Sequence, residues 1–256
     1  TAYHATLCGS QVLERTTKLP VIVMVASEFR YNDPLIDEHT LAIFVSQSGE
    51  TADTLAALRL AKEKGATTIA IANVLGSTIS RDADYVLYTC AGPEIAVAST
   101  KAYTTQLVLL MLLAYYIAQV LGKDIDHELI DQLNTIPQYV ENILNDHAIF
   151  ENYAKMLENL HDAYFIGRSL DYASVLEGAL KLKEVSYVHA DAYIAGELKH
   201  GTIALIEEGT MVVAIATQED MLEKMISNIK EVKARGAYVI TLTKEKYKNV
   251  RGTYVY

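Results

Sequence analysis

The chain has 256 residues, of which 51% are apolar, and a formal net charge of −10. This length and apolar content allow one or two domains with a sizeable core. The acidic balance and the lack of a basic cluster argue against nucleic-acid binding, which needs grouped Lys and Arg side chains. The two cysteines, Cys8 and Cys90, match no metal-ligand spacing and indicate a reducing, cytoplasmic compartment.

Apolar runs separated by turn residues predict alternating elements in the first half. A long helix is expected over Ser99–Leu121, capped by Ser99 or Thr100. Its most apolar part, Leu107–Leu121, is short for a membrane span and contains Gln119, so we expect a buried helix there. The expected strands are Val21–Val25, Leu41–Val45, Thr67–Ala72 and Tyr85–Tyr88, with turns at Asp33-Pro34 and Gly76-Ser77.

The second half begins with a segment, Asp126–Leu160, that is expected to be helical, polar on one side and broken near Pro137. Further strands are expected at Ala163–Gly167, Met211–Ala216 and Tyr238–Leu242. Strands that alternate with helices indicate parallel sheets with helices on both faces, a three-layer α/β fold. Ligands of such sheets bind beyond the carboxyl ends of the strands.

The loop Ser46-Gln-Ser-Gly-Glu-Thr51 follows one of these strand ends and opens an amphipathic helix. The first turn of a helix has backbone N–H groups without internal partners, and its dipole favours an anion. Three hydroxyls surround this point and Gly49 lets the backbone approach closely, which predicts a site for a phosphate monoester. The simpler alternative is an ordinary N-cap made by Thr51 or Ser48.

The chain repeats itself after about 170 residues, a long period typical of two copies of one α/β unit. The segment from Leu41 to the helix ending at Gly65 resembles the segment from Met211 to the helix ending at Gly236. Upstream, Ala26–Tyr31 resembles Ala195–His200. The second copy carries Ala-Thr-Gln-Glu-Asp220 in place of the first loop, so only the first copy is expected to hold phosphate.

Four motifs together resemble the sugar isomerase (SIS) domains, and more narrowly the isomerase half of the glucosamine-6-phosphate synthases. They are Ser46-Gln-Ser-Gly-Glu-Thr-Ala-Asp-Thr54, Glu94-Ile-Ala-Val-Ala-Ser-Thr-Lys-Ala-Tyr-Thr-Thr-Gln106, Leu176-Glu-Gly-Ala-Leu-Lys-Leu-Lys-Glu-Val-Ser-Tyr187 and Ala195-Gly-Glu-Leu-Lys-His-Gly201. The resemblance implies two flavodoxin-like subdomains, over residues 1–124 and 161–256, joined by a helical connection over 125–160. It also implies that the second subdomain is truncated at its carboxyl end.

Glu177, Lys181 and Glu184 are spaced to share one face of a helix. A solvated face with an ion pair would explain three arbitrary charges. Here apolar residues surround the helix and predict burial, where a Glu needs a partner or a raised pKa. The resemblance makes Glu184 the base that moves a proton between C1 and C2 of the sugar. Glu177 and Lys181 would support it.

His200 is the second catalytic candidate, although a lone His beside a glycine is usually structural. The resemblance implies that it opens the sugar ring within the site of a neighbouring subunit, and therefore a homodimer; imidazole suits proton transfer near neutral pH. It also implies substrate contacts from Thr1, Gln47, Val97 and Ser99, besides the loop hydroxyls. Ala2 replaces the serine that is usual in the family, so one sugar hydrogen bond is expected to differ.

The resemblance implies conversion of fructose 6-phosphate and ammonia to glucosamine 6-phosphate without metal or organic cofactor. A glutaminase domain would supply the ammonia, and neither it nor the family's tail lysine is found in these 256 residues. Two alternatives stay open. One is a stand-alone SIS isomerase or deaminase of another amino-sugar phosphate, and the other is a non-catalytic SIS module that senses a sugar phosphate.

Overall fold

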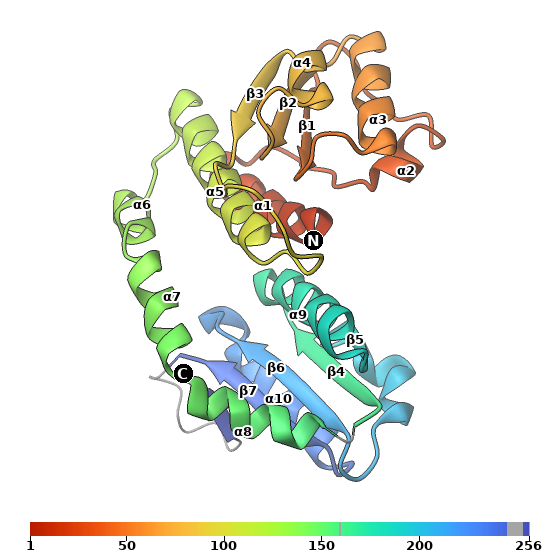
Figure 1. The fold of residues 1–256 in the computed structure, drawn as a ribbon, viewed down its shortest axis with the longest axis vertical. Helices are drawn as coiled ribbons and strands as arrows, with labels where there is room; N and C mark the ends of the chain where they lie inside the picture. The colour runs from red at the N-terminus through yellow and green to blue at the C-terminus, as the bar shows by residue number, and fades with distance from the viewer. Residues whose placement is uncertain (159, 245–252, 256) are drawn as a thin grey trace. The chain divides into compact units, whose positions relative to one another are not determined.

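The computed structural model describes residues 1–158, 160–244 and 253–255 (Figure 1). The chain forms two compact units, Thr1–Asp126 and His127–Tyr256. The second unit includes the helices that follow residue 126. The finer predicted division, with boundaries at residues 124 and 160, stays a prediction.

The first unit is built on a parallel sheet with strand order β1-β2-β3. These strands are Leu41–Ser46, Thr67–Ala72 and Tyr85–Tyr88, as the apolar runs predict. The register sets Leu41 beside Thr67 and Ile69 beside Tyr85. The helices of this unit are α1 (Ala2–Thr17), α2 (Ala26–Phe29), α3 (Ala52–Glu63), α4 (Thr78–Asp82) and α5 (Lys101–Val120).

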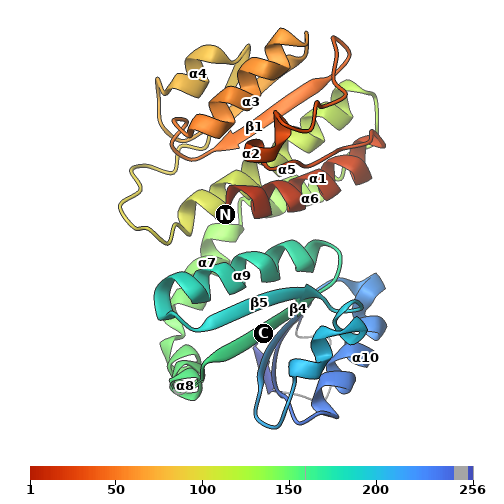
Figure 2. The ribbon, with the colours of Figure 1, turned by 90° about the vertical axis from the view of Figure 1, so that its right-hand side faces the viewer.

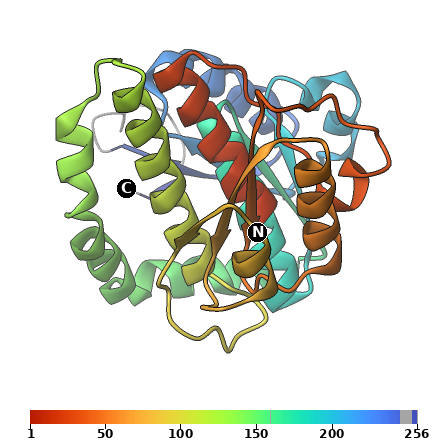
Figure 3. The ribbon, with the colours of Figure 1, turned by 90° about the horizontal axis from the view of Figure 1, so that it is seen from above.

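Alternate side chains of the first sheet build two separate cores, because successive residues of a strand point to opposite faces. On one face, Phe44 and Ala70 pack with Leu58 of α3 and Ile79 of α4. On the other face, Ile71 packs with Ala5 of α1 and Leu110 of α5, among others. Helices α1 and α5 lie side by side over that second face (Figures 1 and 3). The sheet is therefore the middle of three layers.

Two local expectations for the first unit are wrong. Val21–Val25 forms no strand: the segment is extended at Val25 but pairs with no strand among the described residues, and Ile22 is 84% exposed. Among the described strands, β1 pairs with β2 alone, so its other edge has no partner strand there. The expected cap of the long helix is also absent, since Thr100 makes no side-chain cap and the Ser99 hydroxyl donates to the Glu94 carboxylate instead.

Helix α5 is the one described helix that is long and apolar enough to cross a membrane. One such helix is weak evidence for a span, because a core helix of a globular domain passes the same test. Seven of its residues are buried, and two of them, Leu110 and Leu113, pack with Ala5 of α1 and Ile71 of β2. Leu112 and Tyr116, which lie away from this face, remain exposed. The helix is thus buried along one side, not all round.

The second unit has a parallel sheet with strand order β5-β4-β6-β7-β8. Three of its strands fall where the sequence predicts them: β4 (Asp162–Gly167), β6 (Met211–Ala216) and β7 (Tyr238–Thr243). The other two, β5 (His189–Ile194) and β8 (Thr253–Val255), were not predicted. The helices are α6 (His127–Leu133), α7 (Ile136–Asn145), α8 (His147–Leu157), α9 (Leu170–Ser186) and α10 (Leu222–Lys233), with short 3₁₀ turns η1 (Leu198–His200), η2 (Thr202–Leu205) and η3 (Glu219–Met221).

Helices cover both faces of the second sheet, with α9 along one face and α10 along the other (Figure 2). Ile166 and Val212 pack with Met225 and Ile229 of α10. Ala163 and Phe165 point the other way, toward Val175 and Ala179 of α9. The predicted break near Pro137 is confirmed, because Pro137 lies in the first turn of α7, just after α6 has ended.

The sequence repeat corresponds to a repeated order of elements in the two units. The series α2, β1, α3, Gly65, β2 in the first unit corresponds to η1, β6, α10, Gly236, β7 in the second. Both glycines follow a helix with positive φ, at 90° and 95°, which ends the helix and starts the next strand. The predicted fold class, parallel sheets flanked by helices in two α/β subdomains, is confirmed.

Candidate functional site

The loop Ser46–Thr51 lies between the carboxyl end of β1 and the start of α3. Two of its hydroxyls order the loop internally: Ser46 Oγ accepts the Gly49 N–H at 3.0 Å, and Ser48 Oγ accepts the Glu50 N–H at 3.2 Å. Both hydroxyl groups keep their own protons for donation to a ligand. Gly49 has φ +70°, which a residue with a side chain rarely adopts.

The N-cap explanation of this loop does not hold. Thr51 occupies the N-cap position of α3, yet its side chain makes no capping hydrogen bond. Ser48 bonds Glu50, which precedes the helix. The backbone N–H groups of Ser48 and Thr51 form no hydrogen bond within the part of the chain that the structure describes. These donors stand at the positive end of a 12-residue helix, so an anion here would find unoccupied N–H and O–H groups.

The remaining predicted contacts in the first unit are more scattered. Gln47 is half-buried within the loop, and Thr1 is the N-cap residue of α1. Val97 is almost fully exposed in the segment before α5. Ser99 is held by Glu94, whose carboxylate also accepts the N–H groups of the two residues after it. These hydrogen bonds lower the pKa of Glu94, that from Ser99 most.

The corresponding loop of the second unit is already occupied by the chain itself. The Asp171 carboxylate, from the first turn of α9, accepts the Thr217 N–H at 2.9 Å and the Thr217 Oγ–H at 2.5 Å. Asp171 is buried. The Asp171 carboxylate thus binds the Thr217 donors, which follow the carboxyl end of β6, in the way that a bound anion would. This contact supports the expectation that the second loop holds no phosphate.

Helix α9 brings together the three charged residues that the sequence singles out. Lys181 Nζ lies 2.6 Å from Glu184 Oε2 and 3.4 Å from Glu177 Oε1. The expectation that burial continues all round the helix is wrong at its carboxyl end, because Glu177 is buried whereas Lys183–Tyr187 is exposed. Glu184 therefore has both a cationic partner and access to a ligand. Lys183, on the same helix, is exposed and pairs with Asp191 at 3.4 Å.

His200 ends the 3₁₀ turn η1, which follows the carboxyl end of β5, and it is exposed. Glu184 lies near the other end of the sheet. Since α9 connects the parallel strands β4 and β5, it runs back from the carboxyl ends of the strands to their amino ends. Glu184 is fourteen residues beyond Leu170, about 21 Å along the helix at 1.5 Å per residue. The second unit alone does not bring the two candidate groups together.

Two acidic residues that sequence reasoning missed belong to the first-unit site. Glu94 organises the segment that carries Val97 and Ser99, and Glu50 bonds Thr78 at the start of α4. For Glu50, the sequence held a signal: an acidic side chain inside a predicted anion-binding loop would repel the anion. Its carboxylate therefore needs a hydrogen-bonding partner outside the loop. Within the described residues, no cluster of three His, Cys, Asp or Glu side chains could hold a metal ion.

Comparison with known proteins supports this assignment of elements. The SIS domain family model matches residues 1–116 and 156–251. A glutamine–fructose-6-phosphate aminotransferase [isomerizing] from Caldanaerobacter subterraneus subsp. tengcongensis is 56% identical over 248 residues, which are 96% of this chain and 41% of that protein. The aminotransferase of the same name from Clostridium tetani is 56% identical over 253 residues, 98% of this chain and 42% of that protein.

Among solved structures, the C-terminal domain of glucosamine-fructose-6-phosphate aminotransferase from Francisella tularensis superposes with a TM-score of 0.95 at 37% identity. The match covers 99% of this chain and 73% of that one. The chain thus spans about two fifths of the length of the curated relatives it matches. The matched motifs, the repeated parallel sheets and the extent of the family match lead to one assignment: the chain belongs to the SIS domain family.

Proposed function

We propose that this chain is the isomerase part of a glutamine–fructose-6-phosphate aminotransferase. In this function it binds fructose 6-phosphate and, with ammonia, forms glucosamine 6-phosphate and water. The observation that carries the proposal is the loop Ser46–Thr51, where the Ser48 and Thr51 N–H groups find no hydrogen-bond acceptor among the described residues at the start of α3. The relatives at 56% identity bear the name of this activity.

The phosphate group of the sugar would bind at this loop. Ser46, Ser48 and Thr51 donate hydroxyl protons, the Ser48 and Thr51 amides donate N–H groups, and Gln47 adds a side-chain amide. The α3 dipole compensates for the acidic net charge of the chain, which otherwise disfavours an anion. The backbone and hydroxyl donors need no cation. In this proposal Thr1, Val97 and Ser99 contact the sugar itself.

The proton transfers fall to the groups of the second unit. Ammonia adds to the C2 carbonyl of the open-chain sugar, and loss of water leaves an imine. Glu184 then removes a proton from C1 and returns one to C2, while the O1 hydroxyl loses a proton and the imine nitrogen gains one, which gives the amino aldose. Lys181, at 2.6 Å, orients the Glu184 carboxylate and balances its charge, and Glu177 fixes Lys181 from the buried side.

His200 opens the sugar ring in this proposal, and it does so in the site of a second copy of the chain. The positions of the two residues support a shared site. His200 follows β5 and Glu184 lies near the carboxyl end of α9, so the second unit does not bring them close together. A homodimer would exchange His200 between two sites. The ammonia would come from a glutaminase domain elsewhere in the longer protein. The two free cysteines support a cytoplasmic setting.

Complementation between two inactive variants tests the proposal. Glu184→Gln removes the base and His200→Ala removes the ring-opening group, so each variant alone should lose isomerisation. A mixture that exchanges subunits at random contains one intact site in about half of its dimers, or about a quarter of the wild-type sites. Recovered activity supports a shared site. No recovery, with both variants dimeric and able to exchange, would refute the shared His200.

Ligand binding gives a second test that does not need catalysis. Fructose 6-phosphate at about 100 times its dissociation constant should stabilise the chain by about 2.7 kcal/mol. Unphosphorylated fructose should not stabilise it, and inorganic phosphate should have a small effect. A thermal melt insensitive to every phosphorylated hexose would overturn the phosphate assignment of Ser46–Thr51.

A further inference from the structure

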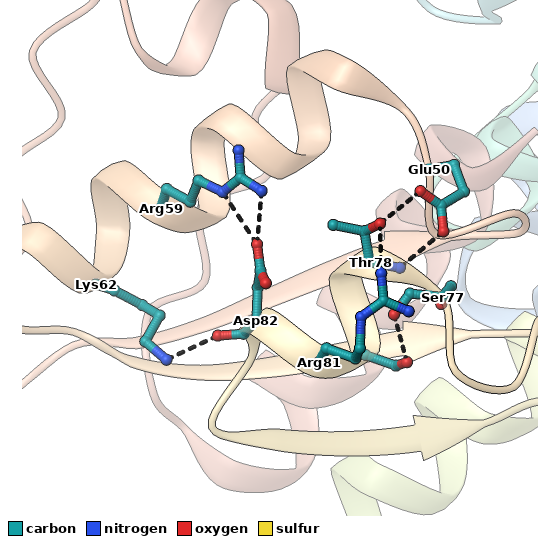
Figure 4. A network of polar contacts seen from close by, with 8 residues as sticks. Glu50, Arg59, Lys62, Ser77, Thr78, Arg81 and Asp82 are labelled. Atoms are coloured by element: carbon teal, nitrogen blue, oxygen red, sulfur yellow. Dashed lines mark hydrogen bonds and ion pairs between the residues drawn. The ribbon is translucent and has the colours of Figure 1, made fainter.

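The phosphate loop is attached to the segment 73–79 by hydrogen bonds to three of its residues. The Asn73 N–H donates to the Gln47 carbonyl at 3.1 Å, and the Ile79 N–H donates to the Gly49 carbonyl at 3.0 Å. The Glu50 carboxylate accepts the Thr78 N–H at one oxygen and the Thr78 Oγ–H at the other, both at 2.7 Å (Figure 4). Only the last of these attachments depends on a loop side chain.

Helix α4, which carries Thr78, is fixed at both ends. Its first turn bonds Glu50, and Arg81 Nη2 donates to the Thr78 hydroxyl at 3.0 Å. At its other end, Asp82 accepts from Arg59 at 2.8 and 3.0 Å, and its carbonyl accepts from Lys62 at 2.7 Å (Figure 4). Arg59 and Lys62 belong to α3, the helix that the loop opens. Because these contacts fix the position of Thr78, its hydrogen bonds to Glu50 can fix the position of the loop.

The carboxylate of Glu50 would otherwise oppose the function of the loop. It is one residue before Thr51, at a place where an anion is to bind, and like charges repel. Its two oxygens instead accept hydrogen bonds from the two Thr78 donors. These hydrogen bonds, the side-chain one most, lower the pKa of Glu50. The group is thus ionised at neutral pH, where a sugar phosphate is charged, and its hydrogen bonds attach it to α4.

We propose that Glu50 is a positioning residue of the phosphate site, and that its attachment to Thr78 holds the loop in the open form that leaves the Ser48 and Thr51 amides free for phosphate. The proposal rests on the proposed function of the loop. It also makes a prediction opposite to simple electrostatics. A neutral residue at position 50 removes a negative charge beside an anion, yet it should weaken the binding of that anion.

The test measures phosphate binding by titration calorimetry for wild type, Glu50→Gln and Thr78→Val. Glu50→Gln should weaken the binding of both inorganic phosphate and fructose 6-phosphate by about tenfold, the loss of a charge-assisted hydrogen bond. Thr78→Val retains the Thr78 N–H and should weaken binding less. The double variant should bind like Glu50→Gln alone, because the two side chains act through one contact.

Asp53→Asn is the matched control. Asp53 lies in the first turn of α3 and carries the same charge as Glu50. Its partner is Arg30, at 3.6 Å, and not a residue of α4. Its neutralisation should leave phosphate binding unchanged or strengthen it slightly. If Glu50→Gln also strengthens binding, charge alone acts at position 50 and the positioning role is refuted.

Hydrogen exchange separates this proposal from the phosphate assignment. In the protein without ligand, Glu50→Gln should speed exchange of the Thr78 and Ile79 amides, which donate to Glu50 and to the Gly49 carbonyl. Asp53→Asn should not. Unchanged exchange in Glu50→Gln overturns the positioning role whatever the ligand does. Faster exchange in a chain whose wild type binds no phosphate would support the attachment and refute the function proposed for the loop.

Discussion

Gly49 allows a quantitative test of the phosphate loop. A Cβ atom at this position would lie 2.3 Å from Ser77 Oγ, 2.7 Å from Ser77 Cβ and 2.8 Å from Ile79 Cγ2. Such contacts are too short for carbon, and the backbone has φ +70°. Gly49→Ala therefore introduces both backbone strain and overpacking. Gly76 is the matched control, since it has φ +68° in the same unit but no atom within 4 Å of the added Cβ.

The two effects can be separated by subtraction. Alanine in the left-handed region costs about 1–2 kcal/mol, and its lower unfolded-state entropy offsets about 0.4–1 kcal/mol. Both variants share this part. Overpacking adds about 1–3 kcal/mol only at position 49. Gly49→Ala should therefore lower the free energy of unfolding by about 1–3 kcal/mol more than Gly76→Ala does.

Urea unfolding at 25 °C, followed by circular dichroism, measures this difference from the transition midpoints. Melting temperatures should differ by about 2–4 °C for each kcal/mol. Phosphate binding supplies the functional readout: Gly49→Ala should lose it, because the loop must move away from Ser77, and Gly76→Ala should retain it. Equal destabilisation by the two substitutions, or phosphate binding retained in Gly49→Ala, would refute the reasoning from close approach.

Three further outcomes are expected. Ser48→Ala should reduce the thermal shift caused by fructose 6-phosphate in a melt, while the melt without ligand changes little; an undiminished shift would exclude Ser48 from the site. Thr217→Val removes a donor from the buried Asp171 carboxylate and should cost about 1.5–3 kcal/mol in urea unfolding, against about 0.5–1.5 kcal/mol for Thr243→Val, whose hydroxyl donates to the neutral Ala216 carbonyl at 2.8 Å. Hydrogen bonds from Thr68 and Lys62 lower the pKa of Asp84 from 3.8 to about 2, so the stability they supply is present above about pH 4 and is lost as pH falls toward 2. Asp84→Asn should therefore be less stable than wild type at neutral pH, and acid titrations of the two should converge near pH 2; a constant difference down to pH 2 would contradict the assigned cause.

The strands that the sequence predicts correctly are those whose own composition is enough to identify them as strands. Leu41–Ser46 and Met211–Ala216 are apolar runs that lie between layers of helices, so composition alone indicates a buried strand. His189–Ile194 was missed because it alternates polar and apolar residues at the edge of its sheet. Val21–Val25 shows the opposite error: its composition favours a strand, but strand formation also needs a neighbouring strand, which local sequence does not specify.

The candidate site was predictable to a similar extent. The phosphate loop and the Glu177–Lys181–Glu184 face follow from spacing along one element, which sequence preserves. The Glu50–Thr78 and Asp171–Thr217 contacts join residues 28 and 46 positions apart, and no local pattern indicates them. The expected cap at Ser99 was wrong for the same reason, since Glu94 competes for that hydroxyl. What sequence reasoning lacked in each case was the identity of the partner.

The one-sided pairing of β1 has a practical consequence for handling this chain in solution. An unpaired strand edge is a template onto which another polypeptide can add, and folded proteins usually block such edges with Lys, Pro or a bulge. Leu41–Ser46 contains neither Lys nor Pro, and the segment that precedes it in the chain exposes apolar side chains at Ile22, Met24 and Val25. Aggregation at high concentration is therefore expected to begin at this edge. A lysine substituted on the exposed side of Val21–Val25 is the first variant to test for higher solubility.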